Sequence, residues 1–150
     1  MGQQQLLLVI LVTIIVGIAT VVAINTFSSA ADSANVDAAR QDALSIAAAA
    51  QQYYMKPAAL GGGNQDFTGM TFQDIGGVPV EMENPTGTPT QAHNQNGTYV
   101  LGGGSTSSIV LTVYPSSCYA AGNSAPNASC ENTNDVLTAT IEANGMSWTN

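Results

Sequence analysis

Nineteen mostly apolar residues, Leu6 to Ile24, follow one another near the start of the chain, and no residue before Asp32 carries a charged side chain. Burying one large aliphatic side chain is worth roughly 1.5–3 kcal/mol, so exposing this run to water would cost on the order of 30 kcal/mol. A helix of about 20 apolar residues can also cross a bilayer. We therefore expect the run to be buried in lipid or among identical helices of neighbouring copies.

The large aliphatic side chains that we expect to be covered share this one segment. They are Leu6, Leu7, Leu8, Val9, Ile10, Leu11, Val12, Ile14, Ile15, Val16, Ile18, Val21, Val22 and Ile24.

A secretory signal peptide is an alternative interpretation of this segment. Such a signal has a basic start, an apolar core of about 7–15 residues and a cleavage site of small residues. The stretch 28–31 could imitate a cleavage site, but the apolar run is longer than a usual signal core and no Lys or Arg precedes it. We expect the segment to be retained in the final protein and to serve assembly.

The charge balance argues against nucleic acid as a partner. The chain has 150 residues and a net charge of −8, and neither Lys nor Arg occurs after Lys56. Affinity for phosphate backbones comes largely from Lys and Arg contacts. We expect no nucleic-acid binding and, after residue 56, one small domain with a solvated acidic surface.

The two cysteines, Cys118 and Cys130, lie in a stretch rich in Gly, Ser, Pro and Asn behind a membrane-type segment. This context favours a disulfide formed outside the cytoplasm. A bridge would stabilise so small a domain by about 3 kcal/mol. Two free thiols or half of a metal site are the alternatives, although the chain has no CxxC pair to support zinc.

A single long helix is predicted from Gln3 to Met55. Gly17 is the one glycine between Gly2 and Gly61, and the helix should stop before Pro57 because the residue preceding a proline avoids helical geometry. In its second half, apolar residues recur at alternating steps of three and four, which indicates an amphipathic stripe. The stripe consists of Val36, Ala39, Ala43, Ile46, Ala50 and Tyr53.

The remainder predicts a small antiparallel sheet. Residues 61–97 are expected to form loops with one short strand, followed by strands at 98–101, 108–114 and 136–142 and an edge strand at 146–149. Gly102–Ser105 suggests a hairpin. The fold class is α+β: a long N-terminal helix at 1–56, with an apolar half at 1–25 and an amphipathic half at 26–56, then a β-rich domain at 57–150.

This order of segments resembles a type IV pilin along the whole chain, with an apolar start, a long helix ending near Tyr53–Pro57, a small antiparallel sheet and a late cysteine pair. The resemblance implies a major structural subunit that polymerises through its apolar helix into an extracellular filament at the cell surface. It also implies an inner-membrane precursor pool, pilus assembly machinery and identical subunits as partners.

The resemblance places N-terminal docking at Met1 and Gln5. Pilins typically carry Glu at the fifth position, where it is thought to pair with the terminal amine of a neighbouring subunit. Gln5 could offer only neutral hydrogen bonds, so docking would rely less on charge. Alternatively, Gly2 stands before a peptidase cut and the mature chain begins at Gln3.

The sequence does not favour an enzyme. His93, the single histidine, lies in a polar stretch without a nucleophile motif, and we expect it to be solvated. Oxygen ligands cluster at Glu131, Asn132, Asn134 and Asp135, and the pairs Asp66 with Asp74 and Glu81 with Glu83 could add others. Their spacing matches no calcium loop, so we expect neither metal nor cofactor.

Two N-glycosylation patterns occur, at Asn96 and at Asn127. Two alternatives to a major pilin stay open at this point. The first is a single-pass anchored extracytoplasmic domain that binds a ligand without polymerising. The second is a minor pilin or secretion-system pseudopilin.

Overall fold

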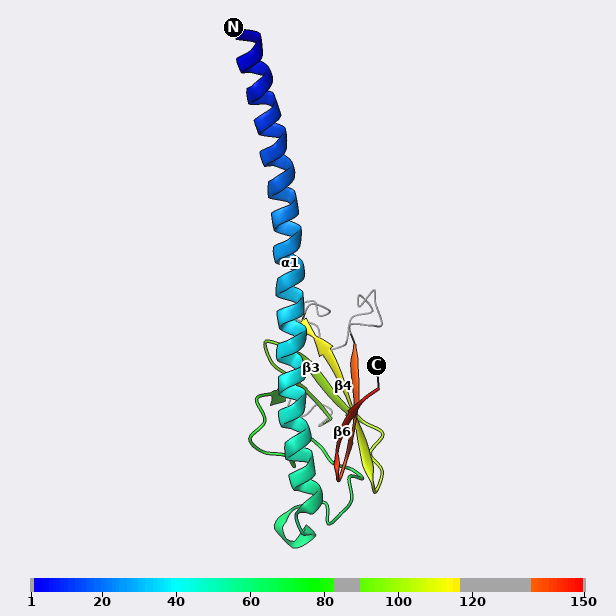
Figure 1. Cartoon of the computed structure of the whole chain (residues 1–150). Coiled ribbons are helices and arrows are strands. Elements are labelled where there is room, and N and C mark those ends of the chain that lie inside the picture. Colours follow the sequence, from blue (N-terminus) through cyan, green and yellow to red (C-terminus); the bar gives the residue numbers. More distant parts are fainter. Residues whose placement is uncertain (1, 83–89, 117–135, 150) are drawn as a thin grey trace. The chain divides into compact units, whose positions relative to one another are not determined.

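The computed structural model describes residues 2–82, 90–116 and 136–149. The chain divides into two compact units, Met1–Ala34 and Asn35–Asn150, and each is described by itself. Figure 1 shows the elements in chain order. They are the helix α1 (Gly2–Met55), the 3-10 helix η1 (Ala58–Leu60) and the strands β1 (Glu81–Met82), β2 (Gln91–His93), β3 (Gly97–Gly102), β4 (Ser108–Pro115), β5 (Leu137–Glu142) and β6 (Gly145–Trp148).

The helix α1 is continuous over 54 residues, which confirms the predicted long helix. It runs through Gly17 without interruption, because the flanking apolar residues and the absence of proline leave the hydrogen-bond ladder intact. It contributes to both units: its first part makes up Met1–Ala34, and its last turns belong to Asn35–Asn150.

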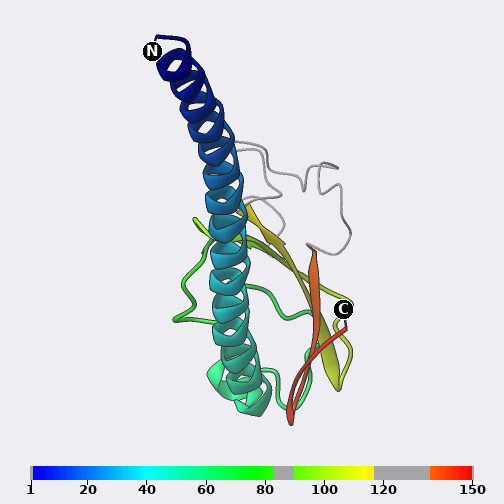
Figure 2. The same ribbon diagram turned by 45° about the horizontal axis from the view of Figure 1, so that its top comes forward.

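The second unit contains a six-stranded sheet in the order β1-β2-β3-β4-β5-β6, with every neighbouring pair antiparallel. Figure 2 shows β3, β4 and β5 side by side. Tyr99 lies opposite Val113, which lies opposite Leu137, so apolar side chains from three strands form one row. The α+β class and the four later strands are therefore confirmed.

The stretch at 61–97 holds two short strands among its described residues, where the sequence indicated one. The strand β2 is three residues long, with a single apolar residue, Ala92, between Gln91 and His93, so its alternation is too short to predict a strand. It pairs with β3 across the turn Asn94–Asn96. Pairing with an apolar neighbour, and not local composition, therefore makes this segment a strand.

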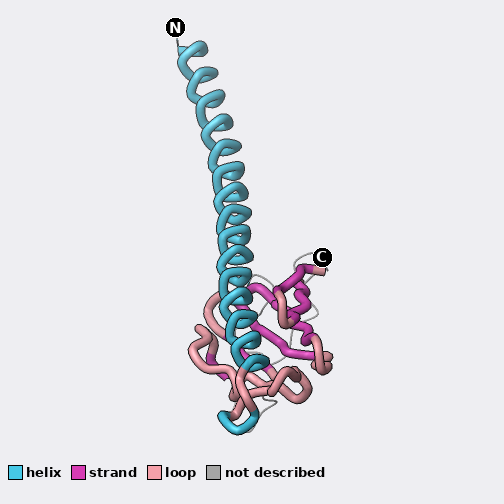
Figure 3. The backbone as a smooth tube through the Cα atoms, turned by 60° about the horizontal axis from the view of Figure 1, so that its bottom comes forward, coloured by secondary structure: helices cyan, strands magenta, loops and turns pink. Residues whose placement is uncertain are grey.

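The core of the second unit lies between α1 and one face of the sheet (Figure 3). In β4 the buried positions alternate with partly exposed ones, so that Ile109, Leu111 and Val113 face the core. The predicted stripe of α1 is confirmed: four of its six members are fully buried and the other two pack against the core. The buried members are Ala39, Ala43, Ile46 and Ala50.

Three of these buried helix positions are alanine, and Ile46 supplies the one large aliphatic side chain among them. Leu44, which falls between the stripe positions, is 54% exposed. The helix face that meets the sheet is therefore narrow.

The end of α1 is fixed by the loop that follows it. The amides of Gly63, Gln65 and Asn64 donate to the carbonyls of Tyr53, Tyr54 and Lys56, at 2.8, 2.8 and 3.0 Å. These bonds satisfy carbonyls that have no partner inside the helix. The ring of Phe67 stacks on that of Tyr54 with centroids 4.6 Å apart, which fastens the loop to the last helical turn.

Candidate functional site

The first unit presents a helix that is apolar and exposed on all sides. Its large aliphatic side chains, the fourteen predicted to be covered, are each between 48% and 69% exposed, and Phe27 is 81% exposed. The segment is long and apolar enough to cross a membrane by length and composition, and none of it is buried within the structure. A helix that is hydrophobic all round is normally covered by lipid or protein.

The hydroxyl side chains of this unit turn back onto the helix. Thr13, Thr20 and Thr26 donate to the carbonyls of Ile10, Val16 and Val22 at 2.8, 2.8 and 2.9 Å. Threonine hydroxyls within helices commonly bond back to a carbonyl three or four residues earlier. Because these hydroxyls already have an acceptor, the segment can leave water with little polar cost.

The predicted docking residues fall at the start of this unit. Gln5 is exposed on α1, and Met1 lies outside the described residues. The role proposed for the pair therefore stays a prediction.

In the second unit, a polar cluster joins α1 to the turn between β2 and β3. One carboxylate oxygen, Asp42 Oδ2, accepts hydrogen bonds from Asn94 Nδ2 at 2.6 Å, Asn96 Nδ2 at 2.7 Å and the Tyr99 hydroxyl at 2.9 Å. We call these four residues the Asp42 cluster. Tyr99 is fully buried, whereas the other three members are partly buried.

Asn94 connects this cluster to the backbone around it. Its Oδ1 accepts from the amides of Asn96 and Gly97 at 2.9 and 3.0 Å, and its Nδ2 donates to the Pro79 carbonyl at 2.9 Å. Burial, reinforced by the hydrogen bond to Asp42, raises the pKa of Tyr99 above its ordinary value of 10.0. Since the donors of the cluster are paired internally, it fastens the turn to the helix and offers no reactive group.

The sequence interpretation missed Asp42. The charged residues nearest to it on the helix, Asp37 and Arg40, lie on the exposed side and form an ion pair at 3.6 Å. The available signal was position: Asp42 precedes Ala43 and follows Ala39 by three residues, which places a carboxylate at the margin of the buried stripe.

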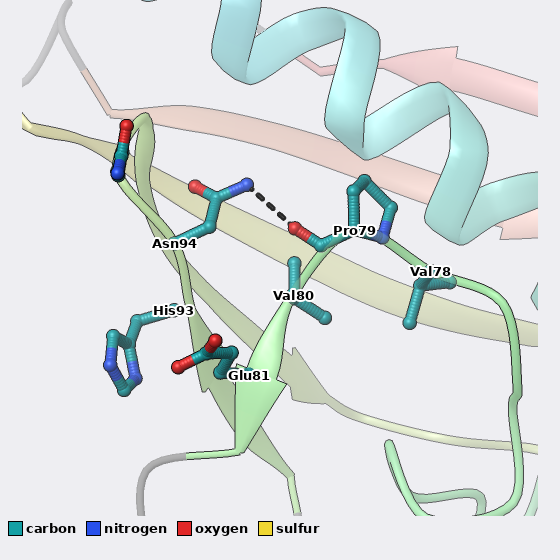
Figure 4. A pocket seen from close by; sticks show the side chains of 7 residues that line it. Val78, Pro79, Val80, Glu81, His93 and Asn94 are labelled. Carbon is teal, nitrogen blue, oxygen red and sulfur yellow. Dashed lines mark hydrogen bonds between the residues drawn. The ribbon is translucent and has the colours of Figure 1, made fainter.

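A cavity of about 580 Å³ lies beside β1 and β2, lined by Val78, Pro79, Val80 and Glu81 from one segment and by His93, Asn94 and Gln95 from the other. Figure 4 shows the side chains of Glu81 and His93 extending from these neighbouring strands, where the two residues are paired in register.

The expectation of a solvated His93 is wrong. The residue is part of β2 and is partly buried, and its Nδ1 is buried without a hydrogen-bond partner among the described residues. Strand pairing, which the polar sequence around His93 does not indicate, removes part of its side chain from water. One imidazole and one carboxylate on two adjacent strands provide neither a nucleophile nor a complete set of metal ligands.

Several predicted residues fall outside the described part of the chain: Cys118, Cys130, Asn127, Glu83, Glu131, Asn132, Asn134 and Asp135. The disulfide and the glycosylation of Asn127 stay predictions. Asn96 is described, and its Nδ2, the atom that would carry a glycan, donates to Asp42. The hydroxyl residue of its pattern, Thr98, is 3% exposed.

Two of the carboxylates named as calcium candidates, Asp66 and Asp74, accept hydrogen bonds from backbone amides. Asp66 Oδ1 accepts from the amide of Thr68 at 2.7 Å, and hydrogen bonding to the side chain and then to the amide of Thr68 lowers the pKa of Asp66. Asp74 Oδ2 accepts from the amide of Thr71 at 2.9 Å. Within residues 2–82, 90–116 and 136–149, no three His, Cys, Asp or Glu residues come together as a metal site would require.

The architecture, a long apolar N-terminal helix followed by an antiparallel sheet, is compatible with that of pilins. In comparisons with known proteins, no protein family, no curated protein and no solved structure matches the chain.

Proposed function

We propose that this chain is the major structural subunit of an extracellular, type IV pilus-like filament, which polymerises by exchanging lipid around its apolar helix for the helices of identical subunits. The observation that carries the proposal is the exposure of aliphatic side chains around the whole of the first unit. Such a surface requires cover, and both lipid and sister helices provide it.

The exchange between the two environments costs little. Lipid tails are as apolar as leucine, so a helix gains or loses little hydrophobic free energy when it moves from lipid into a bundle. The hydroxyls of Thr13, Thr20 and Thr26 are already bonded to their own helix, and no charge precedes Asp32. Packing and the assembly machinery can then decide the end state.

The continuity of α1 favours a filament over a free anchor. The apolar segment passes into the second unit as the same helix, without a Gly- or Pro-rich linker between them. A heterologous contact repeated from copy to copy gives an open helical polymer, because its two surfaces differ and the rotation need not close. The partners in this proposal are identical subunits, the inner membrane before assembly, and the pilus assembly machinery.

Electron microscopy of material sheared from producing cells tests this proposal. We expect long uniform fibres that contain the full chain, and we expect Ile14→Asp to abolish them, because a carboxylate would enter the covered segment. Gln95→Glu adds the same charge at an exposed loop position and should leave the fibres intact.

Other outcomes would favour the alternatives. Short stubs would indicate a minor pilin or pseudopilin. Chain that stays in the membrane fraction without fibres would indicate an anchored binding domain. A monomer in detergent-free buffer would contradict all three interpretations.

A further inference from the structure

The chain contains two Asn-Gly dipeptides, Asn96-Gly97 and Asn144-Gly145, and the fold treats them in opposite ways. Asn-Gly is the dipeptide most prone to cyclise, because glycine has no side chain to hinder its amide nitrogen. Both lie at turns of the second unit, so the same chemistry meets two different environments.

Asn96-Gly97 is held at every atom that the reaction would use. The Asn96 carboxamide donates to Asp42 Oδ2 at 2.7 Å, and the amides of Asn96 and Gly97 both donate to Asn94 Oδ1. Gly97 is buried, and a Cβ there would lie 2.3 Å from the Tyr114 carbonyl oxygen. The Gly97 nitrogen cannot approach the Asn96 Cγ without breaking these contacts.

Asn144-Gly145 is open by comparison. Ala143 and Asn144 form the two-residue turn between β5 and β6, and Asn144 is exposed. Its carboxamide makes no hydrogen bond to another described residue, and a methyl group added at the Gly145 Cα would meet no atom within 4 Å. Gly145 pairs with Glu142 at the last step of the ladder, where strands open most readily.

We propose that Asn144 is a site of spontaneous covalent modification, and that the Asp42 cluster protects Asn96 from the same reaction. The backbone nitrogen of Gly145 attacks the Asn144 Cγ, a C–N bond forms, the bond from Cγ to Nδ2 breaks, and ammonia leaves. Water then opens the five-membered succinimide at either carbonyl, which gives aspartate or isoaspartate at position 144.

The products would alter the β5–β6 turn. Each adds a negative charge beside Glu142, whose carbonyl accepts a 3.1 Å hydrogen bond from Gln51 on α1. Isoaspartate also adds a carbon to the main chain of a two-residue turn, which no longer matches the register of the paired strands.

Peptide mapping by mass spectrometry tests this inference on the full chain in detergent, aged at mildly alkaline pH. In the folded chain, Asn144 should convert at least about tenfold faster than Asn96. The hydrogen bonds that hold Asn96 and Gly97 must break before Asn96 can cyclise, and this raises the activation barrier at that site. In urea the two rates should become similar, because the local sequences are alike.

Two variants sharpen the test. Gly145→Ala, which the open space tolerates, should slow conversion at Asn144, and Asn94→Ala should speed conversion at Asn96. Equal rates in the folded chain, or faster conversion at Asn96, would overturn the inference. So would an Asn144 that stays intact in the folded chain while both sites convert in urea.

Discussion

The hydroxyl of Tyr99 on β3 donates a 2.9 Å hydrogen bond to Asp42 on α1, and this contact links the helix to the sheet by a polar group at the margin of the apolar core. Both partners are also held by the turn between β2 and β3. The stability of the second unit should therefore depend on the Asp42 cluster as well as on apolar packing.

Removing the shared acceptor should be costly. Asp42→Ala leaves the two asparagine amides and the Tyr99 hydroxyl without their partner, and we expect a loss of about 3 kcal/mol in the free energy of unfolding, since each unsatisfied buried group costs roughly 1–3 kcal/mol. Urea unfolding of the full chain in detergent measures it. Asp37→Ala, which removes an exposed ion pair, is the matched control and should change stability by less than about 1 kcal/mol.

The pKa of Tyr99 predicts the response to alkali. Because the folded-state pKa lies above the ordinary value of 10.0, the folded chain holds this proton more tightly than the unfolded chain. The stabilisation is fully present below pH 10 and is lost as the pH rises toward the folded pKa. Thermal unfolding between neutral pH and pH 11 should show this fall, and Tyr99→Phe should show a smaller one. An equal fall in both proteins would contradict the assignment.

Two residues of α1 provide a test of the packing. Ile46 is fully buried, so Ile46→Ala should reduce the free energy of unfolding by about 2–5 kcal/mol through lost transfer energy and a cavity. Leu44 lies two positions earlier and is 54% exposed, so Leu44→Ala should change it by less than about 1 kcal/mol. Denaturant titration of the two variants side by side measures this difference. Similar losses in the free energy of unfolding would contradict the orientation of the helix.

Close backbone approach makes Gly97 hard to replace. A Cβ at this position would lie 2.3 Å from the Tyr114 carbonyl oxygen, so Gly97→Ala must shift β3 away from β4 and should cost about 1–3 kcal/mol. Gly17→Ala is the contrasting variant, because nothing lies within 4 Å and alanine favours a helix by about 0.5–1 kcal/mol. Circular dichroism during thermal unfolding follows both. A Gly97→Ala protein as stable as the original would show that the strands can separate freely.

Much of the fold could be predicted because its signals are local. The apolar run, the stripe from Val36 to Tyr53 and the proline at position 57 define α1, and β-branched residues separated by glycines define the later strands. The strand β2 and the partial burial of His93 could not be predicted, since both arise from pairing with β1 and β3, which the residues of β2 do not themselves indicate. The sequence of a segment shows the periodicity of its apolar residues, but it does not show which strands form hydrogen bonds with that segment.

The candidate site divides in the same way. The apolar surface was evident from composition alone, because nothing in the sequence interrupts it. The Asp42 cluster required the structure: Asp42 is 52 to 57 residues before the other three members, and a carboxylate at the margin of an alanine stripe has many solvated counterparts in other helices.

Aliphatic side chains surround the helix of the first unit on all sides, and a surface this uniform provides little binding specificity. Its surface consists of leucine, isoleucine and valine, and its threonine hydroxyls are bonded to the helix backbone. The length of this apolar surface limits where along the helix axis lipid or another helix can cover it, but the surface favours no angle around that axis over another. In any assembly, the polar surface of Asn35–Asn150 must then determine which partner binds and by what angle neighbouring subunits are rotated. Variants that change a filament's symmetry without abolishing the filament should map there.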